Sequence, residues 1–191
     1  MKIAIVKLSA LGDIVHAMVI LQFIKKSNRA IEIDWIVEES YKELLELNPD
    51  INKVHVINIK KAKKKKSIYL LLSELKNMRK LGPYDLVIDM QGLIKSAIIS
   101  RLIPSPTTLG FNKFSVRESI ASIFYNKTFS YGYDENIIKR NFALIEFALG
   151  VSASKNQIEN KFPFLYSSQR YANSSLSNTK KNIILVPSAS Y

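Results

Sequence analysis

The amino-acid sequence predicts an α/β protein built on a Rossmann-like, doubly wound parallel sheet. Short apolar segments with strand character alternate along most of the chain with segments whose apolar residues recur at helical spacing. Helices of this length between successive strands imply right-handed crossovers and a sheet covered on both faces. The 191 residues suffice for one such domain, and a composition of 47% hydrophobic and 23% charged residues is typical of globular proteins.

Each element has its own local signal. Alternating apolar residues mark the strand at 31–39, whereas Ser40 as N-cap, Glu43 as its capping-box partner and Pro49 as a stop bound a short helix. Ser67 and Gly82 similarly flank a longer helix. The predicted strands comprise residues 2–7, 31–39, 53–59, 83–90 and 107–111. The predicted helices comprise residues 13–26, 40–48, 67–81, 93–103, 115–125 and 135–149.

A change in composition near residue 151 predicts the domain organisation. Residues 1–150 form the alternating region, and residues 151–181 are rich in Ser, Asn and Lys, as expected of a linker and surface segments. Residues 182–191, NIILVPSASY, return to a buried-strand pattern. We therefore expect residues 182–191 to be the first strand of a second, otherwise missing domain.

The charge predicts an anionic partner. The net charge is +12, and six of the seven residues from 60 to 66 are lysine. Such density favours nucleic acid, an acidic lipid surface or a phosphorylated substrate, and the alternative is a solvated lysine run without a ligand. Mutual repulsion predicts an exposed loop or a helix lead-in. No apolar run is long enough to span a bilayer, no secretory signal is expected, and the lack of cysteine excludes disulfides and thiolate metal sites.

The stretch KLSALGDIVHA, residues 7–17, joins the first strand to the first helix. A helix that begins at a strand's carboxyl end presents free N–H groups to a ligand, so Asp13 is a candidate for binding a substrate hydroxyl. The alternative is that Asp13 only caps the helix. His16 follows on nearly the same helix face, where it either orients the site or is a buried neutral histidine bonded to the backbone.

A second stretch, DMQGLIKSA, occupies the equivalent place after the fourth strand. Gln91 and Gly92 follow the strand, and Lys95 falls in the first turn of the next helix. A lysine there opposes the helix dipole, which a nearby anion would offset. Arg117 and Arg140 either pair with neighbouring acids or reach an acidic ligand, while the stripe of Ile120, Ile123 and Phe124 is expected to be core. No metal site and no Ser-His-Asp triad are indicated.

Taken together, KLSALGDIVHA, IDWIVEE, DMQGLIKSA and RESIASIFYNK resemble, in order and spacing, the motifs of bacterial lipopolysaccharide heptosyltransferases of glycosyltransferase family nine. The resemblance is strongest to those that add the first heptose to Kdo-lipid A. It implies a GT-B fold, of which this chain would be the amino-terminal acceptor half plus the first donor-domain strand, inactive alone. It also implies inverting, metal-independent transfer from ADP-heptose, no cofactor, and a peripheral location on the anionic cytoplasmic face of the inner membrane.

The resemblance also assigns roles to individual residues. Asp13 becomes the general base, and because a carboxylate at a helix amino terminus is a weak base, proton transfer is expected late. The residues expected to bind the acceptor are Lys60, Lys61, Lys64, Lys95, Arg117 and Arg140. The residues expected to line the site further are Ser9, Gly12, His16, Gln91, Gly92 and Ser188. The alternatives are a related ADP-sugar glycosyltransferase acting on another core position and a basic nucleic-acid-binding module.

Overall fold

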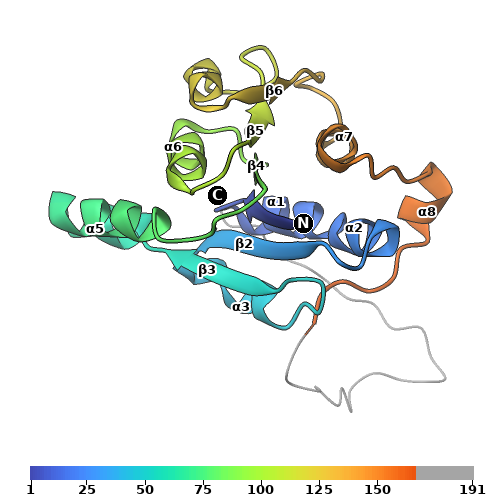
Figure 1. Cartoon of the computed structure of the whole chain (residues 1–191), viewed down its shortest axis with the longest axis horizontal. Coiled ribbons are helices and arrows are strands. Elements are labelled where there is room, and N and C mark those ends of the chain that lie inside the picture. Colours follow the sequence, from blue (N-terminus) through green and yellow to red (C-terminus); the bar gives the residue numbers. More distant parts are fainter. Residues whose placement is uncertain (167–191) are drawn as a thin grey trace, which may run out of the picture.

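The computed structural model describes residues 1–166 as a six-stranded parallel sheet with helices on both faces (Figure 1). The strand order is β3-β2-β1-β4-β5-β6, which is the order of the Rossmann fold, and the predicted fold class is confirmed. The strands are β1 (Lys2–Val6), β2 (Glu32–Glu38), β3 (Lys53–Ile57), β4 (Leu86–Asp89), β5 (Thr108–Phe111) and β6 (Lys127–Phe129). The helices are α1 (Leu11–Met18), α2 (Leu21–Ser27), η1 (Glu39–Tyr41), α3 (Glu43–Glu46), α4 (Ile59–Lys64), α5 (Ile68–Met78), α6 (Ile94–Leu102), η2 (Ser119–Phe124), α7 (Ile137–Leu149) and α8 (Lys155–Glu159).

Side-chain alternation along β1 separates the core into two layers. Ile3 and Ile5 face a cluster that includes side chains of α1, α2, α3 and α7, whereas Ala4 and Val6 face one that includes side chains of α5 and α6. Figure 1 shows α6 and α7 on opposite sides of β4 and β5. Because every described strand pair is parallel, the carboxyl ends of all six strands meet at one edge. The loops that leave this edge position the candidate site.

The first predicted helix is divided and begins earlier than expected. It starts at Leu11 with Ala10 as its N-cap, and the boundary between α1 and α2 falls at Val19 and Ile20. The prediction that Asp13 caps this helix is therefore wrong, because Asp13 is the third helical residue and the N-cap residue, Ala10, makes no side-chain hydrogen bond to the free N–H groups. The predicted helix 40–48 is likewise a 3-10 turn followed by α3, without side-chain caps.

The lysine-rich segment forms a helix rather than a loop. Lysines supply four of the six residues of α4. Ala62 is the buried residue of this helix, with 3% of its surface exposed. The positive side chains gather toward the carboxyl end of α4, where the helix dipole favours cations. This placement offsets part of the repulsion that argued for a loop.

The expected core stripe near residue 120 lies on the surface. Ile120 is 58% exposed and Ile123 is 73% exposed, and Arg117 precedes η2 instead of lying in its first turn. Neither β6 nor α8 was expected from the sequence. Within residues 1–166, no helix is long and apolar enough to cross a membrane.

Candidate functional site

A cavity of about 380 Å³ opens at the carboxyl ends of β1 and β4, next to β5 and the amino-terminal turn of α7. Sequence positions far apart meet here, including Asp13, Gln91, Gly92, Arg117 and Arg140 of the predicted site. The remaining lining residues are Lys7, Met90, Leu93, Phe111, Val116, Tyr133, Glu135 and Ile137. Three cations and two carboxylates thus border one small cavity, which suits an acidic, hydroxyl-bearing ligand.

Lys7 is a site residue that the sequence reasoning missed. Its side chain is 3% exposed, its Nζ donates to the carbonyl of Met90 at 3.2 Å, and Nζ lies 3.7 Å from Asp13 Oδ2. Burial lowers the pKa of Lys7, and the nearby carboxylates of Asp13 and Asp89 oppose this shift. The available signal was a lysine interrupting an apolar run immediately after a strand, a place where its ammonium emerges at the edge of the sheet.

Asp13 presents its carboxylate to the cavity from the first turn of α1. Its side chain is 48% exposed, so one oxygen can meet Lys7 while the carboxylate stays open to a ligand. Lys7 directly follows β1 and Asp13 lies in the first turn of α1, so the short connection between strand and helix brings the two side chains together. A carboxylate held beside a buried ammonium can accept a hydrogen bond from a hydroxyl group.

Gln91 connects the two loops that frame the cavity. Its Oε1 accepts hydrogen bonds from the backbone N–H groups of Leu8, at 2.9 Å, and Ser9, at 3.1 Å. The loop after β4 therefore holds the loop after β1 in place. This second loop leads to Asp13, which lies four residues beyond Ser9. Gln91 lines the cavity, and the hydrogen bonds made by its side chain are those of a positioning residue.

Asp89 in turn fixes the loop that carries Gln91. Its buried carboxylate accepts from the N–H groups of Gln91 and Gly92 at 2.8 and 3.1 Å, and from the Tyr125 hydroxyl at 2.8 Å. Burial raises the pKa of Asp89, and these hydrogen bonds oppose the rise. Gly92 has φ +70°, and a Cβ there would lie 2.7 Å from Cγ1 of Val116. Both the backbone conformation and the close contact therefore favour glycine at this position.

The two arginines play different parts. Arg140 is 7% exposed and donates to the carbonyls of Ser115, at 2.6 Å, and Gly132, while its guanidinium lies 4.6 Å from the centre of the Phe111 ring. Arg140 therefore supports the loops around the cavity and adds positive charge to it. Arg117 is exposed at the rim and makes no ion pair with any described residue, which leaves its guanidinium available.

The four predicted acceptor lysines lie outside the cavity lining. Lys60 lies 4.6 Å from the centre of the Tyr41 ring and donates to its hydroxyl at 3.3 Å; Lys61 and Lys64 are exposed on α4, and Lys95 is half-buried in the first turn of α6. Burial raises the pKa of Glu38, at the end of β2, while the charges of Lys60 and Lys95 oppose that rise. The lysines therefore extend the positive potential along the same sheet edge.

The remaining predicted residues are peripheral. Ser9 contributes its backbone N–H to Gln91, and Gly12 is exposed with open space where a Cβ would stand. His16 has a buried Nδ1 without a hydrogen-bond partner in the described part of the chain, so the expected backbone bond is absent at that nitrogen. None of these three lines the cavity. Ser188 lies outside the described residues.

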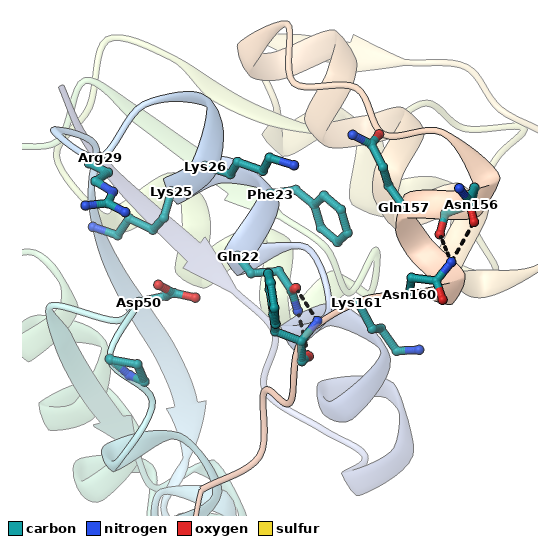
Figure 2. Close-up of a pocket in the computed structure, with 12 residues that line it drawn as sticks. Gln22, Phe23, Lys25, Lys26, Arg29, Asp50, Asn156, Gln157, Asn160 and Lys161 are labelled. Atoms are coloured by element: carbon teal, nitrogen blue, oxygen red, sulfur yellow. Dashed lines mark hydrogen bonds between the residues drawn. The ribbon is translucent and has the colours of Figure 1, made fainter.

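A larger cavity, of about 820 Å³, lies away from these loops (Figure 2). It is bordered by α2, the turn before β3, and α8, and no residue of the predicted site contributes to it. Gln22 bridges it by exchanging two hydrogen bonds with the backbone of Phe162, at 2.9 and 3.2 Å. Among the described residues, no group of three or more His, Asp and Glu side chains could hold a metal ion.

Comparison with known proteins assigns the family. The family model for "Glycosyltransferase family 9 (heptosyltransferase)" matches residues 71–191. Lipopolysaccharide heptosyltransferase 1 of Campylobacter coli is 44% identical over 149 residues, which cover 78% of this chain and 42% of that protein. The Pseudomonas aeruginosa protein of the same name is 32% identical over 152 residues, covering 78% of this chain and 43% of the relative.

Solved structures agree with this assignment. The Escherichia coli heptosyltransferase WaaC with ADP superposes with a TM-score of 0.74 at 30% identity, over 81% of this chain and 49% of the other. A family 9 glycosyltransferase from Veillonella parvula, with a TM-score of 0.64 at 20% identity, covers 79% of this chain and 41% of the other and shares the fold. The chain spans about half the length of the relatives it matches. By sequence and by structure, this chain belongs to glycosyltransferase family 9, the heptosyltransferases.

Proposed function

We propose that this chain is the acceptor-binding half of an enzyme that transfers L-glycero-D-manno-heptose from ADP-heptose to Kdo-lipid A. The observation that carries the proposal is the meeting of Asp13 with Lys7, Arg117 and Arg140 around one cavity at the carboxyl edge of the sheet. Relatives named lipopolysaccharide heptosyltransferase 1 support transfer of heptose to lipopolysaccharide, and a WaaC structure with ADP-2-deoxy-2-fluoro heptose supports an ADP-heptose donor.

The proposed reaction is a single inverting displacement. A hydroxyl oxygen of Kdo attacks the anomeric carbon of heptose, the bond from that carbon to the ADP oxygen breaks, and ADP leaves from the opposite face. The hydroxyl proton passes to the carboxylate of Asp13 late in the step, when the attacking oxygen has become acidic. Lys7 holds the Asp13 carboxylate, and no metal is required for this proton transfer.

The acceptor's acidic groups are proposed to bind the cations of the sheet edge. Arg117 at the rim, Lys95 on α6 and the lysines 60, 61 and 64 on α4 offer donors for Kdo carboxylates and lipid A phosphates. Arg140 contributes charge while it holds the surrounding loops. The acceptor's lipid implies a peripheral enzyme on the anionic cytoplasmic face of the inner membrane.

The domain organisation completes the proposal. Residues 1–150 form the acceptor-binding domain, residues 151–181 connect it onward, and residues 182–191, outside the described part, begin a donor-binding domain. Within the connecting segment, the short helix α8 packs against the core of the acceptor-binding domain. ADP-heptose would bind mainly to that donor-binding domain.

The decisive experiment measures heptose transfer from ADP-heptose to Kdo-lipid A by an enzyme that carries both halves. Asp13→Ala and Asp13→Asn should each lower kcat at least about a hundredfold, the scale of general-base catalysis, with a smaller change in acceptor KM. Glu146→Gln, an acid on α7 that does not line the cavity, is the control. Full activity of both Asp13 variants would remove Asp13 as the base, and absence of transfer by the unaltered enzyme would contradict the function.

A further inference from the structure

The carboxyl end of α4, the turn that follows it and the beginning of α5 form one surface that the proposed function does not use. We call it the α4–α5 surface and define it by Lys63, Lys65, Lys66, Ile68, Tyr69 and Leu72. The two helices pack against each other, and Lys66, with φ +48°, forms the turn between them. Figure 1 shows α5 at the periphery of the molecule, to the side of the sheet. The surface is therefore accessible from solvent.

The lysines of this surface have no neutralising partner within residues 1–166. Lys63, Lys65 and Lys66 are exposed, and none of them forms an ion pair with a described residue. The neighbouring Lys60, Lys61 and Lys64 add three more charges within the same seven residues. Like charges at this density repel one another, so binding to a negatively charged surface relieves an electrostatic cost already present in the fold.

Apolar side chains stand directly beside these lysines. Ile68 is 68% exposed, Tyr69 77% and Leu72 58%, although α5 buries Met78 at its other end to 3% exposure. Residues 68 and 72 are one helical turn apart and 69 adjoins them, so the three side chains share the amino-terminal end of α5. Exposed lysines next in sequence to a cluster of exposed isoleucine, leucine and tyrosine form the pattern of a membrane-interface element.

We propose that the α4–α5 surface docks this chain on an anionic lipid bilayer, with Ile68, Tyr69 and Leu72 entering the headgroup region and the lysines of the same surface contacting lipid phosphates. A bilayer fits both halves of the pattern, because it offers negative charge at its surface and apolar volume beneath it. A nucleic acid would satisfy the lysines and leave Ile68 and Leu72 in water. Tyrosine suits the water–lipid boundary because its ring is apolar and its hydroxyl is polar.

Docking in this way also orients the candidate site. α4 follows the carboxyl end of β3, and the cavity opens at the carboxyl ends of β1 and β4, so both lie on one edge of the sheet. An acceptor anchored in the bilayer would then present its sugar toward Asp13. This orientation, unlike the docking itself, rests on the proposed function.

The first test measures binding of the 191-residue chain to sedimentable vesicles of phosphatidylcholine, with and without phosphatidylglycerol. We expect binding only to the anionic vesicles. The double variant Ile68→Ser/Leu72→Ser should bind at least about tenfold more weakly, because two apolar side chains no longer leave water. Lys63→Gln/Lys65→Gln should also lose about tenfold or more at low salt. All four positions are exposed, so folding is not at stake.

Two matched controls make the result specific. Ile120→Ser/Ile123→Ser removes apolar residues of nearly equal exposure, 58% and 73%, from η2, and Lys155→Gln/Lys161→Gln removes the same charge from a distant segment. Both controls should bind as the unaltered chain does. Equal losses in controls and test variants would overturn the proposal, as would tighter binding of duplex DNA than of anionic vesicles. The vesicle assay does not depend on heptose transfer. A failure of the docking proposal is therefore distinguishable from a failure of the proposed function.

A second test reports insertion directly. Trp35 is the single tryptophan and is fully buried, so its emission provides a constant background. Tyr69→Trp should shift its emission to the blue and be quenched by brominated lipid when anionic vesicles are added. Phe162→Trp, at the same 77% exposure beside the larger cavity, should do neither. An unshifted Tyr69→Trp spectrum with bound protein would show that α5 does not enter the bilayer.

Discussion

Lys7 Nζ lies 3.7 Å from Asp13 Oδ2, and this pair joins a buried ammonium to a half-exposed carboxylate at the mouth of the cavity. The ammonium is largely buried and donates a hydrogen bond to the Met90 carbonyl. The Asp13 carboxylate is thereby fixed at one oxygen while the rest of the group faces the ligand. The geometry separates orientation, supplied by Lys7, from proton acceptance, supplied by Asp13.

Replacing Lys7 with methionine should affect catalysis more than stability. The exchange removes the desolvation cost of the ammonium, and the Asp13 carboxylate left without its partner is 48% exposed and stays hydrated, so stability should change by no more than about 2 kcal/mol. The kcat for heptose transfer should fall about tenfold or more, because Asp13 loses its orienting contact, and KM for ADP-heptose should stay unchanged. Lys7→Arg keeps the positive charge but changes the geometry of its contact with Asp13. A wild-type kcat in Lys7→Met would contradict the positioning role of Lys7.

The pH dependence of stability gives an independent check on Lys7. Its pKa is lowered in the folded chain by burial, so over the range between the lowered value and about 10.4 the unfolded chain binds more protons. Unfolding free energy therefore rises with pH across that window relative to Lys7→Met. Urea denaturation of both proteins from neutral to alkaline pH measures the difference. A difference that is flat or falls with rising pH would show that burial does not disfavour the ammonium.

Gln91→Leu should lower activity without unfolding the protein. The variant leaves the N–H groups of Leu8 and Ser9 without their acceptor, at a cost of about 1–3 kcal/mol at the buried Leu8 and less at the half-buried Ser9. The loop that leads to Asp13 then loses its support, and we expect kcat to fall about tenfold or more. Amide hydrogen exchange at Leu8 and Ser9 should accelerate. Gln157→Leu on α8, exposed and outside this cavity, is the matched control.

Gly92→Ala should destabilise the fold, and a second change should partly restore it. Alanine costs about 1–2 kcal/mol at φ +70°, and its Cβ would meet Val116 Cγ1 at 2.7 Å. Val116→Ala removes the second penalty but not the first. Thermal denaturation of the two single variants and the double variant should therefore show a favourable coupling energy. Strict additivity would mean that the close approach to Val116 contributes nothing.

Arg117 and Arg140 should separate binding from stability. Arg117→Ala removes an exposed rim cation, so stability should change by less than about 0.5 kcal/mol while acceptor KM rises. Arg140→Ala leaves the carbonyls of Ser115 and Gly132 without their donor and should lower the free energy of unfolding by about 3 kcal/mol or more. Denaturant titration and acceptor kinetics on both variants test this. The reverse pattern, with Arg117→Ala unfolding and Arg140→Ala affecting only KM, would exchange the two roles.

Much of the fold follows from local patterns. The strands at Lys2–Val6, Glu32–Glu38 and Lys53–Ile57 were predictable because apolar runs bounded by turn residues specify strands locally. Strand β6, with three residues and two of them exposed, carried no such signal. The helix near 115–125 was expected to bury Ile120 and Ile123, but η2 is a short 3-10 helix that buries Ala121 instead. Periodicity identifies an apolar stripe and does not show whether the fold covers it.

The candidate site divides in the same way. The sequence by itself determined the α/β sheet, the position of Asp13 just after the first strand, and the position of Gln91 just after the fourth, because strand ends and helix starts are encoded by neighbouring residues. Only the tertiary structure decided that Lys7 is buried against Met90 and Asp13, that Gln91 holds the backbone of Leu8 and Ser9, and that Arg140 is committed to loop carbonyls. Most of these contacts join residues 25 to 83 positions apart, and they exist only where the parallel strands bring their carboxyl ends to one edge.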